Sequence, residues 1–534
     1  MTNVRTEVLV VGGGLGGVAA ALAALRAGHH VVLTEQYEWL GGQLTSQAVP
    51  MDEHTWVEQF GVTASYRQLR DGIRDYYRAW YPLTPQARAD RYLNPGAGLV
   101  SRICAEPRVG VAVIDAMLAP HLSAGRLTVI KPARPITADI DGDRVKAVTV
   151  ENTTSGQQTT IEARFVLDAT ELGDLLPLTG TEYVSGFESQ AETGEPSAPA
   201  IAQPGNVQAV SWCFAIDHVD GNHVIDEPND YQFWRTYQPA FWDNPLLSLT
   251  GPDPRTLENV TRTFTPNLDE DPASAIADQR ASGGDRELWT FRRIAARKQF
   301  APGTYDSDIV LVNWPMIDYF EGSIIDTPDA VEHLEATRQL ALCAMYWLQT
   351  EAPRPDGGTG WPGLRLRGDV TGTADGLAMA PYIRESRRTR AQYTVVEADL
   401  SVAIRGHGKP STFPDSVGVG MYRIDLHPST GGDNYIDLPS VPFEIPLGAL
   451  IPIRMQNILP AGKNIGTTHI TNGAFRVHPV EWNIGEAAGW LAAFCIDNAV
   501  DPRAVRNTPQ LLAEFQSTIS NQGVELHWPD VSGY

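Results

Sequence analysis

The sequence predicts an α/β fold in which the two ends of the chain form one domain and the middle forms another. Three observations predict it. A buried strand, a glycine-rich turn and a helix follow one another over residues 8–28, and a second buried strand ends at the acidic residue Glu35. Strand and helix patterns then return from Pro446, after a long central stretch of different composition. The predicted units are a discontinuous α/β domain, residues 1–185 and 445–534, and a central mixed α+β domain, residues 186–444.

The first strand, turn and helix have the order of a Rossmann-like dinucleotide site. Residues 8–11 are a short, β-branched apolar run, which is typical of a strand covered on both faces. Gly12 and Gly14 carry no side chain where the backbone must turn tightly and approach a pyrophosphate, and Gly17 lets the helix pack closely on the strand. The amides at the start of the helix and its dipole stabilise phosphate charge without a basic side chain.

Glu35 stands where a ribose-binding acid is expected. Gly28 ends the helix, and residues 29–34 form the next strand. A carboxylate about 20 residues beyond the glycines is placed to accept hydrogen bonds from an adenosine ribose. A signal peptide or membrane anchor does not fit this stretch, because it contains six glycines, Arg26 interrupts it, and no run approaches the roughly 20 apolar residues of a span.

The composition is that of an ordinary globular protein and argues against two classes of partner. The chain has 534 residues, 43% of them hydrophobic and 20% charged, which is enough for a large core and two domains. Acidic residues outnumber basic ones by 64 to 41, so the formal net charge is −23. Such a surface repels phosphate backbones and anionic lipids, and we therefore expect neither a nucleic-acid nor a membrane partner.

The four cysteines indicate a reducing compartment. They are far apart, form no CxxC pair and have no histidine spacing that suggests zinc: Cys104, Cys213, Cys343 and Cys495. We expect buried free thiols, no metal site and a cytoplasmic location.

Local patterns predict several further elements. Residues 107–122 have the apolar spacing of a helix, and residues 127–130 read as a strand. Residues 136–140 and 145–150 form a hairpin around the turn Asp141-Gly142-Asp143.

The central stretch is rich in proline, aromatic residues and acidic loops. Seven of the thirteen tryptophans fall there: Trp212, Trp234, Trp242, Trp289, Trp314, Trp347 and Trp361. We expect most of them in the core, with one or two left to line an aromatic-walled substrate pocket.

Two later strands bring more small residues toward the predicted site. Residues 163–169 form a buried strand that runs through Asp168-Ala169-Thr170, where small side chains allow a cofactor to approach. Residues 458–466 again run from a strand into a glycine turn and lead to residues 478–489, where small residues recur through the start of a closing helix that we expect from Asn483.

Together these motifs resemble the FAD-dependent oxidoreductase family related to the glutathione-reductase-type flavoproteins. Members combine an N-terminal glycine fingerprint, an acid at the end of the second strand, a Gly-Gly pair just after it, a strand ending Asp-Ala-Thr, and a late Ala-Gly segment followed by a helix that faces the flavin. All five are present in this order. The Gly-Gly pair is Gly41-Gly42, and the late Ala-Gly pair is Ala461-Gly462. The resemblance covers roughly residues 1–180 and 445–500 and continues through residues 380–388 and 422–427.

The resemblance implies FAD as the cofactor and twelve residues in contact with it. They are Gly12, Gly14 and Gly17 at the pyrophosphate, Glu35 at the adenosine ribose, Gly42 and Gln43 beside the flavin, Ala169 and Thr170 at the strand end, Gly462 and Asn464 at the ribityl chain and phosphate, and the amides of Asn483 and Ile484 at the pyrimidine ring. A helix N-terminus has a chemical meaning at that ring, because a reduced flavin carries negative charge around N1 and O2.

One departure from the family pattern concerns nicotinamide use. Flavin hydroxylases that use NADPH usually have Gly-Asp in the late segment, whereas this chain has Gly462-Lys463. The sequence also lacks a second strand, GxGxxG and helix unit for a nicotinamide. Direct reaction with NAD(P)H is therefore disfavoured.

The first candidate base is His427. Residues 422–427 alternate strictly, which puts Arg423, Asp425 and His427 on one face of a strand that either meets solvent or lines the site. In the second case His427 takes a substrate proton while hydride leaves for the flavin. Asp425, about 7 Å away on the same face, is expected to tune His427 only through packing.

The second candidate base is His478, just before the closing helix, with a helix-entry residue that satisfies backbone groups as the alternative. Arg384, together with Arg387 and Arg388, either binds an acidic substrate or forms structural ion pairs. Three further candidates are Asn313 and Asp318 at a strand end, and His54 as a covalent attachment point for flavin.

The sequence thus predicts an FAD-dependent oxidase or dehydrogenase that oxidises a small organic substrate by hydride transfer to flavin. Two alternatives stay open: a flavin monooxygenase served by a separate reductase, and a non-redox dinucleotide-binding protein. The substrate, the electron acceptor and the oligomeric state, including a homo-oligomer, are also left open.

Overall fold

The largest sheet of the protein is built from both ends of the chain. The computed structural model describes residues 2–273, 285–406 and 408–531. Five strands of this sheet run parallel in the order β3-β2-β1-β6-β22: β1 (Thr2–Val11), β2 (Val31–Thr34), β3 (Leu127–Ile130), β6 (Gln158–Asp168) and β22 (Ile458–Pro460). The last four residues of β1 are fully buried, as a strand covered on both faces requires.

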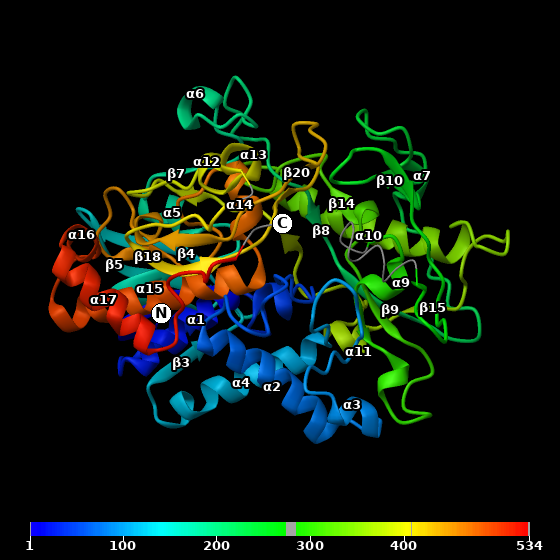
Figure 1. Cartoon of the computed structure of the whole chain (residues 1–534), viewed down its shortest axis with the longest axis horizontal. Helices are drawn as coiled ribbons and strands as arrows, with labels where there is room; N and C mark the ends of the chain where they lie inside the picture. Colours follow the sequence, from blue (N-terminus) through cyan, green and yellow to red (C-terminus); the bar gives the residue numbers. More distant parts are fainter. Residues whose placement is uncertain (1, 274–284, 407, 532–534) are drawn as a thin grey trace.

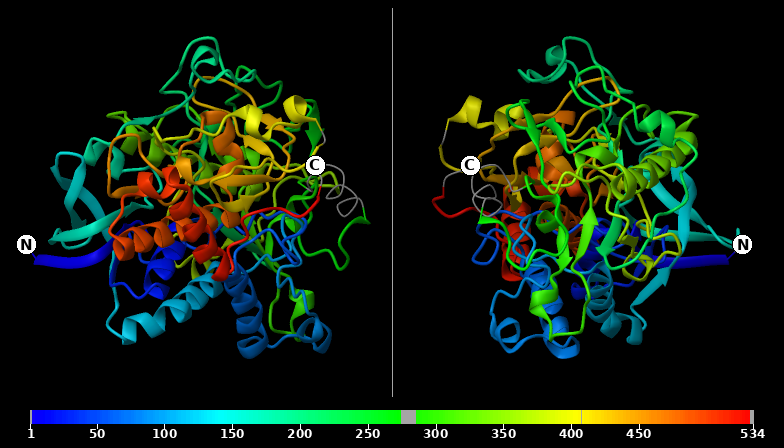
Figure 2. Two further views of the ribbon diagram at one scale, coloured as in Figure 1. Left: turned by 60° about the vertical axis from the view of Figure 1, so that its left-hand side comes forward. Right: turned by 90° about the vertical axis from the view of Figure 1, so that its right-hand side faces the viewer.

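The antiparallel hairpin forms where the sequence predicts it. Strands β4 (Ala133–Asp141) and β5 (Arg144–Asn152) pair around residues 142–143, and β5 then pairs antiparallel with the first half of β6. In both views of Figure 2 this cyan hairpin lies on the same side of the molecule as the N-terminus.

Strand β22 joins the C-terminal part of the chain to the N-terminal sheet. Ile458 pairs with Val166 and Pro460 with Asp168, in parallel register with the second half of β6. Figure 1 shows the orange and red C-terminal helices beside the blue N-terminal helix, while the green central part of the chain gathers on the opposite side.

The two long core helices pack on each other through glycines. Helix α1 (Leu15–Arg26) follows the glycine turn, and helix α15 (His478–Asn498) is buried along nearly its whole length. A Cβ on Gly485 would overlap the backbone of Gly16, and a Cβ on Gly489 would overlap the backbone of Ala20. Because only glycine allows this approach, the small residues of the closing helix fix its position on α1.

Further helices surround this core. They are α2 (Ala64–Trp80), α3 (Pro85–Ala89), α4 (Pro107–Ser123), α5 (Leu175–Thr179), α14 (His469–Phe475), α16 (Pro502–Asn507), α17 (Pro509–Asn521), and the short 3₁₀ helices η1 (Gly42–Leu44) and η4 (Leu447–Leu450). The predicted helix over residues 107–122 and the predicted strand over residues 127–130 are confirmed as α4 and β3.

The central part of the chain has its own small sheets and its own hydrophobic core. One sheet has the order β12-β13-β9-β15: β9 (Phe214–His218), β12 (Arg293–Ala295), β13 (Ile309–Val312) and β15 (Leu364–Leu366). Another has the order β14-β8-β16: β8 (Val210–Ser211), β14 (Asp318–Tyr319) and β16 (Tyr382–Ile383). Six of the seven central tryptophans are buried, and Trp212 is partly buried against the core, so most of them are core residues as predicted.

The remaining described elements are short apart from helix α10 (Ala330–Thr350). The helices are α6 (Gln190–Thr193), α7 (Tyr231–Trp234), α9 (Leu288–Phe291), α11 (Gly368–Thr371), α12 (Glu397–Leu400), α13 (Val402–Arg405), η2 (Arg297–Gln299) and η3 (Pro315–Ile317). The strands form pairs: β7 (Tyr183–Val184) with β17 (Arg388–Thr389), β10 (Thr250–Pro252) with β11 (Asn259–Thr261), β18 (Ser416–Gly420) with β21 (Phe443–Pro446), and β19 (Ile424–Leu426) with β20 (Ile436–Leu438).

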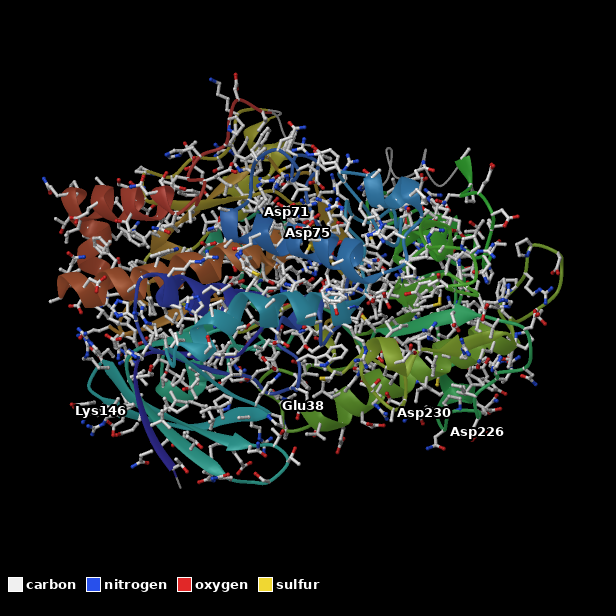
Figure 3. The ribbon with its side chains drawn as sticks, turned by 90° about the horizontal axis from the view of Figure 1, so that it is seen from below. Glu38, Asp71, Asp75, Lys146, Asp226 and Asp230 are labelled. Carbon is white, nitrogen blue, oxygen red and sulfur yellow. The ribbon has the colours of Figure 1, made fainter. Side chains whose placement is uncertain are left out.

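The acidic charge is spread over the surface. Asp71 and Asp75 on α2 and Asp226 and Asp230 just before α7 are all exposed, and Figure 3 shows the two pairs in different parts of the molecule. Over the described ranges, no helix has the length and apolar character that crossing a membrane requires. All four cysteines are buried and unpaired, as the sequence predicts.

Candidate functional site

The predicted glycine turn lies where β1 ends, α1 begins and β6 ends. Gly12 has a left-handed backbone with φ of 98°, and a Cβ there would overlap the backbone of Ala169. A Cβ on Gly17 would overlap the carbonyl of Gly12. Glycine is therefore required at both positions for the helix to begin directly against the strand ends.

Gly14 faces side chains rather than backbone. A Cβ on Gly14 would lie 3.1 Å from Oε1 of Glu171 and 3.4 Å from Oε1 of Glu481. The amide of Gly16, in the first turn of α1, donates a hydrogen bond of 3.4 Å to the same Glu481 oxygen. A carboxylate thus occupies the anion-binding position at the N-terminus of α1.

Glu35 reaches the glycine turn from the end of β2. Its Oε2 accepts a hydrogen bond from the amide of Gly13 at 2.6 Å, and its Oε1 accepts one from the amide of Tyr37 at 2.9 Å. Burial raises the pKa of Glu35 to about 7, against the opposing effect of these amides. The structure therefore brings this predicted residue to the fingerprint.

The short helix η1 joins the glycine turn to the entry of α15. Gly42 has a φ of 51°, and a Cβ on it would lie 2.9 Å from the Cα of Gly14. The side-chain amide of Gln43 donates to the carbonyl of Arg476 at 2.8 Å and also to the carboxylate of Glu481. Gly42 and Gln43 thus lie beside the fingerprint, although more than 400 residues separate Gln43 from its partners.

The end of β6 presents the predicted small residues next to Asn464. Oδ1 of Asp168 accepts hydrogen bonds from the Thr170 hydroxyl at 2.7 Å and the Thr170 amide at 3.1 Å. Asn464 donates to the Asp168 carbonyl at 3.0 Å, and Ala169 lies under Gly12. Burial raises the pKa of Asp168 to about 7.

Lys463 supplies the positive charge of this region. Its ammonium group is buried and paired with the carboxylate of Glu171. Burial by itself would lower the pKa of Lys463, but Glu171 and Glu481 raise it above its usual value. Gly462 lies beside them, with a Cβ position 3.7 Å from Oε1 of Glu481.

The structure places the start of α15 earlier than the sequence pattern predicts. The helix begins at His478, and the Glu481 amide is already bonded to the Val477 carbonyl at 2.9 Å. Asn483 and Ile484 therefore lie in the second turn, where backbone amides bond within the helix. The Asn483 side chain donates to a carbonyl of β18 at 3.1 Å. The amides at the open end of α15 are those of the first turn, which begins at His478.

The residues around the fingerprint fit a bound dinucleotide. The glycines place no side chain between the backbone and the N-terminus of α1, which is the usual cradle for a pyrophosphate. Several buried polar atoms nearby have no hydrogen-bond partner within the described ranges: the Thr34 hydroxyl, the Gln47 amide group, Asp168 Oδ2, Asn464 Oδ1 and Asn472 Oδ1. Buried polar atoms without partners are rare in folded proteins, so a polar ligand is expected to satisfy them.

His427 forms the central contact of a second group of polar side chains. Its Nδ1 lies 2.6 Å from Oδ2 of Asp318, which is fully buried at the start of β14. Its Nε2 lies 3.9 Å from Oδ2 of Asp425, and about a fifth of the His427 side chain is exposed. Asp318 thus selects the tautomer of His427 that carries its proton on Nδ1 and leaves Nε2 as an acceptor.

Asp318 is held in its ionised form. Its Oδ1 accepts hydrogen bonds from Ser211 at 2.5 Å and from Arg384 at 3.0 Å. Burial would raise the pKa of Asp318, but Arg384, His427 and Ser211 lower it to about 2. Burial and Arg384 lower the pKa of His427 below its usual value, although Asp318 acts in the opposite direction. At neutral pH the pair is therefore a neutral imidazole on a charged carboxylate.

Arg476 connects this pair to the cofactor side. Its guanidinium donates to Oδ2 of Asp425 at 2.9 Å and to the hydroxyl of Tyr382 at 3.0 Å. Its carbonyl accepts the hydrogen bond from Gln43. A continuous path of polar contacts thus runs from the predicted flavin-binding residue Gln43 to His427.

Asp425 contacts His427 more directly than the strand pattern indicates. The expectation that it acts only through packing assumes a continuous strand, in which the two side chains stand about 7 Å apart. Strand β19 ends at Leu426, however, so His427 leaves the strand and its ring comes within 3.9 Å of the Asp425 carboxylate.

His478 and His54 are engaged by backbone groups. Nδ1 of His478 accepts the amide of Asp52 at 3.1 Å, and its Nε2 lies 3.1 Å from the carbonyl of Val49. His54 similarly contacts the amide of Trp56 and the carbonyl of Gly61. The structure therefore favours the helix-entry alternative for His478 and leaves His427 as the candidate base.

The arginine group around residue 384 consists of ion pairs. Arg384 pairs with Asp318, Arg387 with Asp326 at 2.9 Å, and Arg388 with Glu385 at 2.5 Å. The structure thus supports the ion-pair alternative for this segment. Asn313, a further candidate, lies 3.4 Å from Arg384 and so belongs to the same network.

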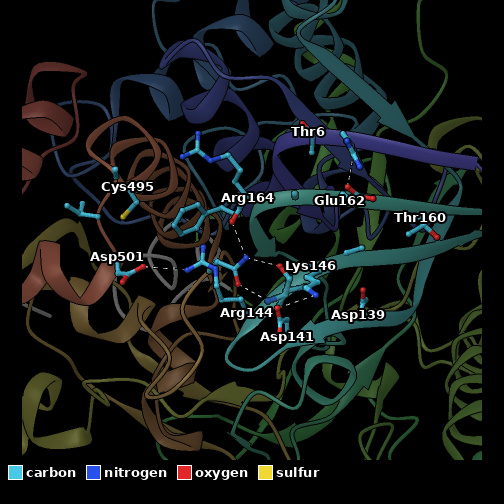
Figure 4. Close-up of a pocket in the computed structure, with 18 residues that line it drawn as sticks. Thr6, Asp139, Asp141, Arg144, Lys146, Thr160, Glu162, Arg164, Cys495 and Asp501 are labelled. Atoms are coloured by element: carbon cyan, nitrogen blue, oxygen red, sulfur yellow. Dashed lines mark hydrogen bonds and ion pairs between the residues drawn. The ribbon is translucent and has the colours of Figure 1, made fainter.

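A separate groove of about 990 Å³ lies between the β4–β5 hairpin and the end of α15 (Figure 4). Its charges are largely paired: Arg5 with Glu162, Lys146 with Asp141, and Arg144 with Asp501. None of the predicted site residues lines it. No group of three or more histidine, cysteine, aspartate or glutamate side chains in the described ranges is arranged to hold a metal ion.

Several members of the network were not predicted from the sequence. Arg476, Glu481 and Asp437 lie in it without having been singled out. The sequence does contain a signal for Asp437: the triplet Ile-Asp-Leu occurs at residues 424–426 and again at residues 436–438. In the structure the two triplets pair antiparallel, with Asp425 opposite Asp437.

Comparison with known proteins identifies the family of the chain. The sequence matches the family of FAD-dependent oxidoreductases over residues 7–519. A search of curated proteins found no significant match.

The matches among solved structures are distant. The OxyS anhydrotetracycline hydroxylase from Streptomyces rimosus is 12% identical, with a TM-score of 0.32 and coverage of 96% of this chain and 65% of the other. A geranylgeranyl bacteriochlorophyll reductase-like protein from Thermoplasma acidophilum is 11% identical, with a TM-score of 0.30 and coverage of 98% and 85%. Mycobacterium smegmatis Sdh1 is 13% identical, with a TM-score of 0.21 and coverage of 32% and 34%, so this chain spans about a third of its length.

These structural likenesses are too low to say anything about activity. The family match is different in kind, because it covers nearly the whole chain. It agrees with the glycine fingerprint, the acid at the end of β2 and the parallel sheet built from both chain ends. The chain belongs to the FAD-dependent oxidoreductase family, and it is an enzyme with FAD as its cofactor.

Proposed function

We propose that this enzyme is an oxidase or dehydrogenase that removes hydride from a small organic substrate while His427 accepts a proton from the same substrate. The observation that carries the proposal is the hydrogen bond between His427 and the ionised Asp318, linked through Asp425 and Arg476 to Gln43. It supports a base that is oriented, neutral at pH 7 and joined to the cofactor side of the protein.

The proposed FAD site follows the fingerprint from the end of β2 to the start of α15. The residues proposed to hold FAD are Gly12, Gly14, Gly17, Glu35, Gly42, Gln43, Ala169, Thr170, Gly462 and Asn464, with the first-turn amides of α15 in place of those of Asn483 and Ile484. When bound, FAD supplies the two-electron acceptor of the reaction.

His427 performs the proton transfer in this proposal. Asp318 holds the proton on Nδ1, so the lone pair on Nε2 is available to accept a proton, and about a fifth of the side chain is exposed. When Nε2 takes a substrate proton, the imidazolium lies between the carboxylates of Asp318 and Asp425, which stabilise its charge. An oriented base of this kind contributes about 10²–10⁴-fold to the rate.

Arg476 and Arg384 keep the two carboxylates in place. Each donates to one carboxylate, Arg476 to Asp425 and Arg384 to Asp318, and both guanidinium groups are buried. These arginines therefore position the carboxylates and offset their mutual repulsion.

The test is anaerobic mixing of the purified yellow enzyme with a panel of alcohols, amines, amino acids and hydroxy acids. The proposal expects one class to bleach the flavin absorbance, and admission of oxygen then distinguishes an oxidase, which recovers its colour, from a dehydrogenase. Bleaching only by NAD(P)H with a separate reductase, followed by oxygen insertion, would support a monooxygenase instead. A pure protein without flavin absorbance would contradict the family assignment as well.

A further inference from the structure

The polar groups around His427 indicate what the substrate looks like. These groups, together called the His427 site, are His427, the carboxylates of Asp318, Asp425 and Asp437, and the guanidinium groups of Arg384, Arg423 and Arg476. Solvent reaches part of the site, because the side chains of His427, Asp425 and Arg423 are 21%, 18% and 16% exposed.

Each arginine of the His427 site is already paired with a carboxylate. Arg384 lies 3.0 Å from Asp318 and Arg476 lies 2.9 Å from Asp425. Arg423 is paired with Asp437, which Arg255 also approaches at 3.8 Å. An anionic substrate would need a cation that is not committed elsewhere, and these arginines do not offer one.

Each carboxylate of the His427 site is likewise paired with an arginine. Asp437 has Arg255 as a second cationic neighbour, and His427 is neutral at pH 7 because its pKa is lowered. A cationic amine would need an excess of negative charge at the site, and the pairing removes that excess. The charge pattern therefore selects against both an anion and a cation.

Two neighbours of His427, Tyr435 and Gln208, have buried polar atoms that a ligand with hydroxyl groups could satisfy. The hydroxyl of Tyr435 is buried and has no hydrogen-bond partner among the described residues, and the ring of Tyr435 packs against His427 with centroids 5.5 Å apart. The side-chain nitrogen of Gln208 is also buried without a described partner, while its oxygen accepts the backbone amide of His427 at 3.4 Å. A hydroxyl group both donates and accepts, so it can satisfy a tyrosine hydroxyl and an amide nitrogen.

An aromatic wall borders the same place. Trp242 stacks on Tyr435, with ring centroids 6.2 Å apart and an interplanar angle of 13°. Flat aromatic faces beside a few placed polar groups are typical of small-molecule sites. Tyr435 is thus a buried aromatic neighbour of His427 whose hydroxyl lacks a partner among the described residues.

From these observations we infer that the substrate is a neutral polyhydroxylated compound, a sugar or polyol, which the enzyme oxidises at a secondary alcohol. The inference rests on the proposed function for the base and the electron acceptor. The O–H and C–H bonds of the carbinol break and a C=O bond forms. The hydroxyl proton goes to Nε2 of His427, and the carbon-bound hydrogen leaves with two electrons to the FAD.

The experiment compares sugars that differ only in charge. Holoenzyme is mixed anaerobically with glucose, galactose and mannose, each as the neutral sugar, the uronate and the 2-amino sugar, and with lactate and alanine for the competing classes. Flavin bleaching gives the rate, and perturbation of the flavin spectrum before bleaching gives binding. We expect at least one neutral sugar to bleach the flavin at least about tenfold more efficiently than its two charged analogues.

Other outcomes overturn the inference in distinguishable ways. The substrate class is overturned if a uronate, an amino sugar, lactate or alanine bleaches the flavin while the neutral sugars do not; the proposed oxidation then still stands. The substrate class is also overturned if no sugar gives any response. Binding of a neutral sugar without bleaching keeps the substrate class and overturns the proposed function.

A charge variant tests the pairing argument directly. Asp437→Asn leaves Arg423 without its carboxylate at the His427 site, so affinity for the matching uronate should rise about tenfold relative to the neutral sugar. The matched control is Asp326→Asn, which frees Arg387 from one partner outside this site and should leave the preference unchanged. An unchanged preference in Asp437→Asn, in protein that retains FAD, would overturn the pairing argument.

Discussion

Oδ2 of Asp318 lies 2.6 Å from Nδ1 of His427, across 109 positions of sequence. The carboxylate is fully buried and ionised, so it fixes the proton on Nδ1 and leaves Nε2 as the acceptor. This contact turns a strand-end histidine into an oriented base.

Asp318→Asn should slow flavin reduction by about 10²–10⁴-fold, because an amide can present its NH₂ to Nδ1 and stabilise the wrong tautomer. The pH profile carries a second signature. Activity needs neutral His427 and is lost as pH falls through its pKa, which Asp318 raises. Removing the charge lowers that pKa further, so the acid limb of kcat/KM should move to lower pH.

Ser211→Ala is the matched control for this variant. It removes a hydrogen bond from the same carboxylate but leaves the charge, so it should change the rate far less. An Asp318→Asn enzyme with bound FAD, a normal rate and an unmoved acid limb would show that the carboxylate does not orient His427.

Gly14→Val should give colourless protein. A side chain at Gly14 extends toward Glu171 and Glu481, into the space that the pyrophosphate needs above the N-terminus of α1. Gly205→Val is the control, because a Cβ there meets open space and its protein should stay yellow. The ratio of flavin absorbance to protein absorbance checks both. A fully loaded Gly14→Val protein would count against the phosphate assignment.

Glu35→Ala should weaken FAD binding by about 1.5–3 kcal/mol, the value of hydrogen bonds to a charged acceptor. Glu35 has a pKa raised to about 7 in the protein without cofactor, so its accepting, ionised form is lost as pH falls below 7. FAD affinity of the wild type should therefore decrease from pH 8 to pH 6, and that of Glu35→Ala should change less. Titration of deflavinated protein measures both, and equal affinities would remove Glu35 from the site.

We propose that residues 1–185 and 445–534 form one discontinuous domain, with residues 186–444 as the central domain. The pairing of β22 with β6 and the packing of α15 on α1 support this division. A chain that ends at Pro446 exposes the apolar surface of that sheet and should be insoluble or free of flavin.

A point variant tests the same interface in the full chain. Gly485→Val places a side chain against the backbone of Gly16 and should destabilise the protein and reduce its flavin content. Soluble, yellow protein from the shortened chain would contradict the discontinuous domain.

Local patterns were enough to predict the cofactor half of the site. Strand β1, the glycine turn and α1 follow from residues adjacent in sequence, and Gly12 and Gly17 are required by their immediate backbone contacts. The start of α15 lies before the predicted one, because Pro479 at the second helical position is a stronger start signal than the small residues after Asn483.

The substrate half could be predicted only in part. The alternation around Asp425 and His427 was visible, and Ile424 and Leu426 are buried as it requires. The partner of His427 could not be predicted, because Asp318 lies 109 positions away in a different small sheet. The residue pattern of neither segment predicts the contact between Asp318 and His427.

The central claim is that His427 is the base, and anaerobic stopped-flow measurement of flavin reduction tests it most directly. With a substrate that bleaches the wild-type flavin, His427→Asn should keep its FAD and reduce it about 10²–10⁴-fold more slowly. His478→Asn, whose native ring contacts only backbone groups among the described residues, is the comparison and should reduce its bound flavin at a near-normal rate. Normal reduction in His427→Asn, with the loss appearing in His478→Asn instead, would contradict the account.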